Sequence, residues 1–203
     1  MTARKFLLAD PARPEGSDNP HTREKIVDAL TELMAAGEKL THDAAAARAS
    51  ISRRTVYRYF PDQASLRAAV WTRLGPAGGI PASLDDLLGG MEERFANFDR
   101  KAATMTVAMA SAEGRAIRNV MKDERVAAWR TMLADRVEAL AEPDRTRAIA
   151  VIQLIGTGLA WREMRDQWDM EAEGMTIACS WAIEALLADL ERRGGKPLSE
   201  GAA

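Results

Sequence analysis

The sequence contains few of the residues on which metal sites and many catalytic sites depend. One cysteine, Cys179, and two histidines, His21 and His42, occur among 203 residues. A single cysteine excludes an internal disulfide and a cysteine-rich metal site. Neither histidine lies in an H-E-x-x-H or Glu-x-x-His motif, so zinc and di-iron bundle sites have no support. We therefore expect no metal and no other cofactor.

Glycine-rich phosphate-binding loops are also absent. Neither G-x-x-x-x-G-K nor G-x-G-x-x-G occurs. Gly156-Thr-Gly158 lies inside an apolar helical pattern with no strand before it, so close packing against another helix explains it better than a phosphate site. Adjacent acids such as Asp85 and Asp86 are expected to face solvent. The sequence thus indicates that the protein is not an enzyme, and a helical enzyme is the least favoured class.

Long hydrophobic runs are missing as well. No apolar run approaches the roughly 20 residues that span a membrane. The apolar stretch near the N-terminus has about four residues, too few for the ~7–15-residue core of a signal peptide. With 47% apolar and 29% charged residues, the chain has the composition of a globular protein. We expect a cytoplasmic protein without membrane contacts.

Charge is unevenly distributed although the net charge is only −2. Residues 21–75 hold nine basic and six acidic residues, whereas residues 76–203 hold sixteen basic and twenty-one acidic. A basic segment joined to an acidic remainder suggests that phosphate contacts are confined to the first part of the chain.

Helical signals recur along residues 21–75. The pattern predicts a first helix from Thr22 that stops at Gly37, and Thr41 is expected to cap a second, alanine-rich helix. Ser52 can cap a third helix, which Pro61 ends. Asp62 then caps a fourth. Three short helices with narrow apolar stripes predict a compact unit of about 50 residues.

All later segments also have helical periodicity, so the sequence predicts an all-α fold. The run G-P-A-G-G-I-P at 75–81 predicts a domain boundary. Long helical segments are expected at 83–98, 100–112, 118–141, 143–168 and 172–193. The predicted organisation is a flexible arm (1–20), a helix-turn-helix domain (21–75), a helical ligand-binding and dimerisation domain (80–193) and a C-terminal tail (194–203). Arg4, Lys5 and Arg13 of the arm could reach a minor groove, but a disordered tail is the simpler interpretation.

The segment from Leu40 to Leu66 carries the strongest functional signal. Between Arg48 and Arg58 there are four arginines and no acid. Val56 and Phe60 share one face of the third helix, which leaves a cationic and aromatic outer face suited to a polyanion. The alternative is a solvated arginine-rich helix.

This segment resembles the N-terminal domain of the TetR family of bacterial transcriptional regulators. The resemblance covers Thr22 to about Val70 and follows the pattern T…G…T…A…S…T-[LV]-Y-x-[HY]-F…L. The residues that carry it are Thr22, Gly37, Thr41, Ala45, Ser52, Thr55, Val56, Tyr57, Tyr59, Phe60 and Leu66. Two positions depart from the family. The turn reads Ala-Ser-Ile-Ser at 49–52 instead of Ala-Gly-Val-Ser, and Gln63 replaces a lysine that commonly contacts phosphate.

Chemistry and resemblance together assign hypothetical roles in DNA binding. Guanidinium groups suit guanine edges and phosphates, and a threonine can contact a thymine methyl or a base edge. Thr41 and Ser52 join a hydroxyl to a helix N-terminus, and the resemblance implies that the tyrosines bind backbone phosphates. The candidate DNA-binding residues are Thr41, Ser52, Arg53, Arg54, Thr55, Tyr57, Arg58, Tyr59 and Gln63.

The resemblance further implies a homodimer formed by the last two long helices, and an effector pocket in the middle helices. Candidate interface residues are Leu154, Gly156, Gly158, Trp161, Trp181, Ile183, Leu187 and Leu190. Methionine and tryptophan can line an adaptable pocket, although they fill a plain core equally well. The candidate pocket residues are Met105, Met109, Met121, Trp129 and Met132, with Glu113 or Glu163 available for a cationic ligand.

The function that the sequence favours is a ligand-responsive transcriptional regulator. As a homodimer it would bind a palindromic double-stranded operator, most simply as a repressor that a small molecule releases. The alternative is a helical protein that binds a small hydrophobic ligand and no operator. The intact Thr55-Val56-Tyr57 run and the uneven charge favour the regulator.

Overall fold

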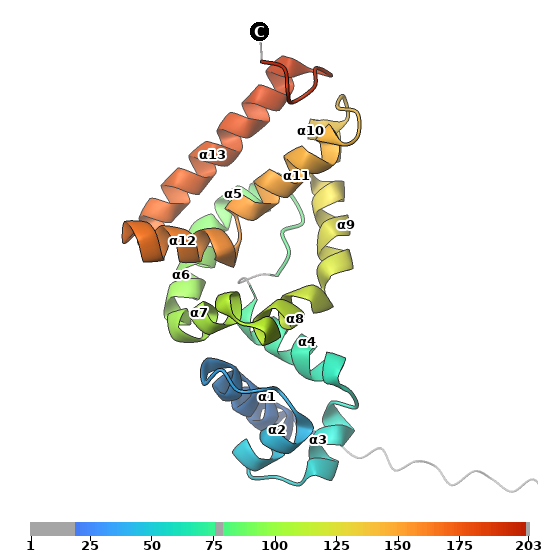
Figure 1. The fold of residues 1–203 in the computed structure, drawn as a ribbon, viewed down its shortest axis with the longest axis vertical. Coiled ribbons are helices and arrows are strands. Elements are labelled where there is room, and N and C mark those ends of the chain that lie inside the picture. Colours follow the sequence, from blue (N-terminus) through green and yellow to red (C-terminus); the bar gives the residue numbers. More distant parts are fainter. Residues whose placement is uncertain (1–18, 76–78, 202–203) are drawn as a thin grey trace, which may run out of the picture.

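The protein is described by a computed structural model that covers residues 19–75 and 79–201, and its regular structure there is entirely helical (Figure 1). The predicted all-α fold is thus confirmed. The basic residues of the predicted arm lie outside the described residues, as does the centre of the predicted linker. The N-terminal unit consists of α1 (Pro20–Ala35), α2 (His42–Arg48), α3 (Arg53–Tyr59) and α4 (Gln63–Leu74).

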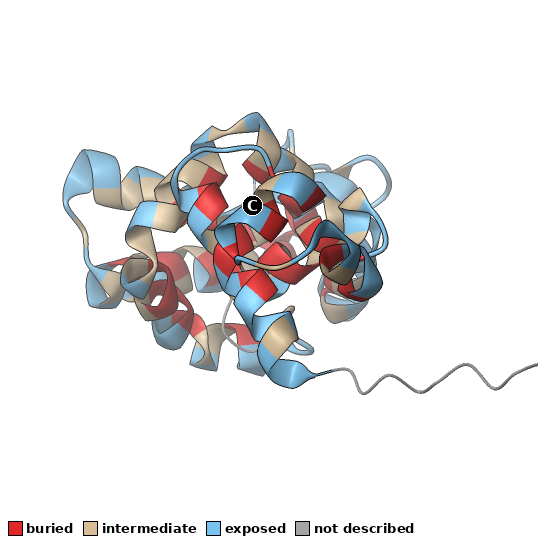
Figure 2. Ribbon diagram, turned by 90° about the horizontal axis from the view of Figure 1, so that it is seen from below, coloured by how far each residue is buried: buried red, intermediate tan, exposed pale blue. Residues whose placement is uncertain are grey.

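Nine further helices follow within the described residues. They are α5 (Leu84–Gly89), α6 (Met91–Arg100), α7 (Ala102–Ala110), α8 (Ala112–Val120), α9 (Lys122–Met132), α10 (Ala134–Val137), α11 (Asp144–Ile155), α12 (Gly158–Trp168) and α13 (Ala172–Arg193). Buried residues lie on the faces that the helices turn toward one another (Figure 2), and they form one hydrophobic cluster from Ile26 to Leu190. The N-terminal unit therefore shares a continuous core with the rest of the molecule.

Polar caps fix the starts of the N-terminal helices. The side chains of Thr41, Ser52 and Asp62 each accept a hydrogen bond from a backbone amide in the first turn of α2, α3 and α4, so these three predicted caps are confirmed. The predicted start of the first helix is wrong. α1 begins at Pro20, because the Asn19 side chain caps it and proline is well tolerated in the first turn.

The turn between α2 and α3 requires a left-handed residue. Ser50 has φ +51°, and the backbone amides of Ser50 and Ile51 donate to the carbonyls of Ala47 and Ala46. This pairing is a Schellman motif, in which glycine is the usual left-handed residue. The serine at this position is therefore strained.

Replacing Ser50 by glycine is expected to raise the free energy of unfolding by about 0.5–1 kcal/mol. A left-handed conformation costs a residue with a Cβ about 1–2 kcal/mol, and part of that gain is offset by the greater freedom of glycine in the unfolded chain. Urea denaturation of the purified variant measures the change. Ser50→Val, which is β-branched, should be destabilising, and a glycine variant less stable than the parent would contradict the prediction.

Several predicted long helices are divided in the structure. The predicted helix 143–168 is two helices, because Gly156 ends α11 and the Thr157 side chain caps α12. Two glycines weaken a helix, and a threonine between them offers a new start. The predicted segment 118–141 is likewise interrupted at Met121 and Leu133. In contrast, the last predicted helix is continuous as α13.

Candidate nucleic-acid interface and internal pocket

The outer face of α3 is cationic and exposed. Val56 is fully buried against the core, while Arg53, Arg54 and Arg58 are exposed and Tyr57 is 40% exposed. Among the described residues, the side chain of Arg54 has no hydrogen-bond or ion-pair partner. Its guanidinium group is thus available for a bidentate contact.

Other side chains of this face are held in place by α2. The Tyr57 ring stacks on the His42 ring with centroids 3.8 Å apart, and His42 Nε2 lies 2.8 Å from the carbonyl oxygen of Phe60. Arg53 forms a 3.0 Å ion pair with Asp43 and lies over the Tyr57 ring. Its hydrogen bond to Tyr57 and the nearby Asp43 carboxylate raise the Arg53 pKa. These contacts order the two helices as one unit.

Tyr59 differs from the other candidates because it belongs to the core. The residue is 7% exposed, and its hydroxyl accepts a 3.0 Å hydrogen bond from the Asn19 backbone amide. Tyr59 therefore joins α3 to the start of α1. Val56, Tyr59 and Phe60 share the buried side of the segment, so Tyr59 does not lie on the exposed face with Tyr57.

The remaining DNA-binding candidates lie around the turn. Thr41 and Ser52 are exposed, although both hydroxyls cap helices, and Ser52 Oγ also lies 2.8 Å from Thr55 Oγ1. The amide of Gln63 donates to the Leu40 carbonyl. Gln63 thus ties the start of α4 to the residue before Thr41.

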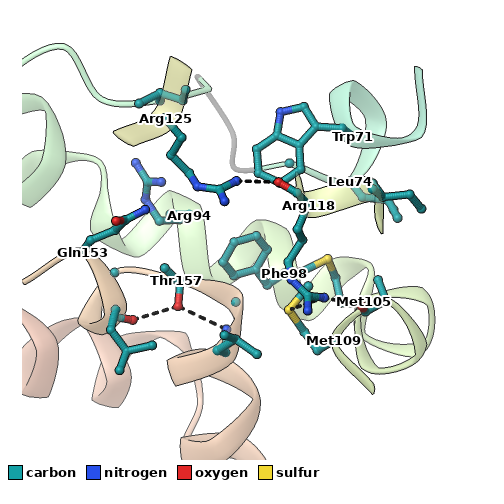
Figure 3. A pocket seen from close by; sticks show the side chains of 18 of the residues that line it. Trp71, Leu74, Arg94, Phe98, Met105, Met109, Arg118, Arg125, Gln153 and Thr157 are labelled. Carbon is teal, nitrogen blue, oxygen red and sulfur yellow. Dashed lines mark hydrogen bonds between the residues drawn. The ribbon is translucent and has the colours of Figure 1, made fainter. Parts of the chain in front are cut away.

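The middle helices enclose a pocket of about 280 Å³ (Figure 3). Of the pocket candidates, Met105, Met109 and Trp129 line it, while Met121 and Met132 do not. The prediction of those two methionines is wrong for this pocket. Glycines shape the wall as well: a Cβ on Gly158 would lie 3.0 Å from Met105 Cε, so α12 approaches α7 closely.

Three arginines that were not predicted as pocket residues reach this pocket. Arg94 comes from α6, Arg118 from α8 and Arg125 from α9, and the described lining contains no acidic residue (Figure 3). Arg94 had a detectable signal, since it occupies a helical-period position within the buried run Met91, Phe95 and Phe98. Neither acid considered for a cationic ligand lines the pocket, because Glu113 forms a 2.7 Å ion pair with Arg67 and Glu163 is exposed.

These guanidinium groups are poorly solvated. Burial lowers the pKa of Arg94, and burial together with neighbouring arginines lowers the pKa of Arg118. Burial also lowers the pKa of Arg125. Because arginine stays protonated in proteins, the pocket carries positive charge in an apolar setting.

α4 connects the pocket to the N-terminal helices. Trp71 and Leu74 of α4 line the pocket, and Arg125 lies over the Trp71 ring at 5.3 Å. The half-buried pair of Arg67 and Glu113 joins α4 to α8. α4 therefore contacts the pocket directly and, through Gln63, the residue before the cap of α2.

The predicted interface residues fall into two groups. Leu154 is 51% and Trp181 71% exposed, and Leu187 is partly buried. The other five are buried inside the subunit, which corrects their assignment to a dimer seam: Gly156, Gly158, Trp161, Ile183 and Leu190. Trp161 packs on Phe98 and donates to Asp99 Oδ1 at 2.8 Å. Further exposed apolar residues that were not predicted lie on α11, α12 and α13: Val151, Leu159, Trp168 and Ile177.

No group of three or more potential ligands could hold a metal ion in residues 19–75 and 79–201. Over the same part of the chain, no helix combines the length and apolarity that a membrane span needs.

The sequence matches no protein-family model and no curated protein. Two solved structures are similar, both from Rhodococcus sp. RHA1. A TetR-like transcriptional regulator is 16% identical, with 82% of this chain and 96% of that chain covered and a TM-score of 0.55. A TetR transcriptional regulator is 20% identical, with coverage of 84% and 98% and a TM-score of 0.49. The alignment of the first structure over most of both chains, together with the helix-turn-helix, shows that this chain has the fold of TetR-like transcriptional regulators.

Proposed function

We propose that the protein is a DNA-binding transcriptional regulator that recognises a palindromic operator as a homodimer and responds to a small molecule, most simply as a repressor. The observation that carries the proposal is the exposed cationic face of α3, presented by a helix-turn-helix in this fold. A recognition helix of this kind reads base edges in the major groove. Arg54 and Arg58 are assigned to bases or phosphates, while Tyr57, Thr41 and Ser52 are assigned to the phosphate backbone.

Selection of bound sequences from random double-stranded DNA tests this proposal directly. We expect enrichment of a palindrome, because two recognition helices about 34 Å apart read two half-sites one DNA turn apart. Absence of any enriched sequence would favour the alternative, a ligand-binding helical protein without an operator.

Single substitutions then separate base reading from phosphate binding. Arg54→Ala is expected to weaken operator binding by about 5- to 150-fold, the range for a lost bidentate base contact of ~1–3 kcal/mol. Loss of a phosphate contact would instead weaken all DNA sequences alike and lower the salt dependence by about one counterion. Titration of labelled operator at several salt concentrations distinguishes the two.

Arg100→Ala provides the matched control, since it removes the same charge from an exposed arginine on α6 that is paired with Glu93. Its DNA affinity should stay within about twofold of the parent, because surface charges beyond a Debye length of ~8–10 Å are screened. If Arg54→Ala bound as tightly and selectively as Arg100→Ala, the assignment of α3 would be wrong.

Dimerisation is assigned to the exposed apolar strip formed by Val151, Leu154, Leu159, Ile177 and Trp181. Large exposed apolar residues grouped on neighbouring helices are typical of association surfaces. Regulation is assigned to the path from the pocket through Trp71 and α4. The proposed dimer would exist in two states, with recognition helices either at the spacing of the operator or at a wrong spacing. A ligand that binds the second state more tightly would lower operator affinity by the difference between its affinities for the two states.

A further inference from the structure

The pocket contains a buried cation with no counterion in the described chain. Arg94 is 5% exposed, and its Nε has no hydrogen-bond partner. No ion pair within residues 19–75 and 79–201 involves Arg94, and burial alone shifts its pKa. A buried charge costs free energy unless it is paired. A buried, unpaired arginine in a cavity therefore indicates that an anionic ligand binds there.

The two neighbouring arginines do not supply that partner. Arg118 Nη1 donates to the Ala108 carbonyl, and Arg125 Nη1 donates to the Arg118 carbonyl at 2.9 Å. Each is thereby positioned by the backbone while its charge stays uncompensated by any carboxylate of the described lining. Gln153 and Thr157 add polar groups to the same lining (Figure 3). Guanidinium and amide donors that line one pocket can recognise an anionic group.

The rest of the lining is apolar. Trp71, Phe98, Met105, Met109 and Trp129 provide aromatic rings and flexible thioethers around the arginines. The volume of about 280 Å³ lies near the lower end of the ~300–1,000 Å³ range of ligand pockets. The occupant is therefore small, with an apolar body and a charged end.

We propose that the pocket binds a small organic carboxylate, whose apolar body lies among Phe98, Trp129 and the methionines and whose carboxylate pairs with Arg94 and Arg125. This inference rests on the proposed effector role of the pocket and names the chemical class of the effector. Because Arg125 lies over Trp71, a carboxylate on that arginine acts next to α4.

Matched compounds that differ mainly in the charge of their polar end test the chemical class of the ligand. Octanoate and 4-phenylbutyrate are each compared with the corresponding primary amide and primary amine by calorimetric titration and by thermal unfolding of the full-length protein. The carboxylates should bind at least about tenfold more tightly than the amides, equivalent to ~1.4 kcal/mol, and the amines should not bind. The proposal is overturned if amide or amine binds as well as the acid, or if neither acid binds at millimolar concentration.

The variant Arg94→Met tests whether Arg94 pairs with the carboxylate of the ligand. It removes the unpaired charge at similar length, so the free protein is expected to unfold at a higher temperature than the parent. The variant should also lose the preference for acid over amide. Arg100→Met on the same helix changes an exposed, ion-paired arginine and should leave both properties unchanged. If Arg94→Met retained the preference for acid, Arg94 would not be the anion partner.

The ligand class and the proposed function can fail independently in these experiments. Ligand binding is measured without DNA, so failure to select an operator leaves its outcome untouched. Adding octanoate or 4-phenylbutyrate to the complex with the selected operator then tests regulation. Carboxylate binding without any change in operator affinity would support the ligand class and contradict the effector role.

Discussion

Replacing Trp181 by glutamate is expected to turn the proposed dimer into a monomer at micromolar concentration. Trp181 is 71% exposed on α13, one turn after Ile177, which is 66% exposed. Tryptophan is enriched at interaction hot spots, where loss of a side chain costs at least about 2 kcal/mol. A carboxylate left unpaired in the interface adds a further penalty. Together these effects predict a dimer dissociation constant raised by about 100-fold or more.

Sedimentation velocity over a range of protein concentrations measures this change. Val126→Glu is the control, because Val126 is an apolar residue on α9 with 37% exposure and lies outside the strip. That variant should sediment as the parent does. The monomeric variant should also lose affinity for a palindromic operator while its affinity for a half-site changes little. A Trp181→Glu protein that remained dimeric would remove α13 from the proposed interface.

The helix-turn-helix could be predicted closely from sequence because its signals are local. Thr41, Ser52 and Asp62 each cap the helix that follows them in the chain, and Pro61 ends the preceding one. Capping depends on hydrogen bonds within about three residues, so tertiary structure alters it little. The error at the start of α1 has the same local origin, since Asn19 and Pro20 form a better start than Thr22.

The direction in which an apolar side chain points depends on tertiary packing. For this reason the sequence did not show which apolar residues are exposed and which are buried inside the subunit. Trp161 and Trp181 were both predicted to lie in the dimer interface, yet one is fully buried within the subunit and the other is 71% exposed. An apolar pattern indicates that one face of a helix is buried. It does not indicate whether that face packs against the same subunit or against a second one. The neighbours that bury Trp161, namely Phe98 and Asp99, are about 60 residues away in sequence.

The charge of the pocket could not be predicted for a related reason. Arg94, Arg118 and Arg125 lie on three helices and appear in the sequence as ordinary surface arginines. Only Arg94 stands out, because its neighbours at helical spacing are buried. Composition identified Met105 and Met109, because it indicates the apolar part of a pocket but not the polar groups that decide ligand class.

Truncation of Trp161 to alanine is expected to lower the free energy of unfolding by about 3–5 kcal/mol, the range for a buried aromatic side chain. Trp161 is completely buried, its ring contacts Phe98 edge-on at 5.9 Å, and its indole donates to Asp99. The substitution opens a cavity between α12 and α6 and also removes a partner from the Asp99 carboxylate. A loss of this size is a large fraction of the ~5–15 kcal/mol by which most domains are stable.

The measurement is best made by urea denaturation in the Trp181→Glu background, where subunit association does not add to the apparent stability. Trp168→Ala is the matched control, since Trp168 lies on the same helix but is 71% exposed. It should change stability by no more than about 0.5 kcal/mol. Trp161→Phe keeps the ring contact with Phe98 and loses the hydrogen bond, so an intermediate loss is expected. The prediction would be contradicted if Trp161→Ala were as stable as Trp168→Ala and instead weakened dimerisation in the parent background. Trp161 would then be an interface residue, because only a side chain that packs against the second subunit can be truncated without destabilising the first.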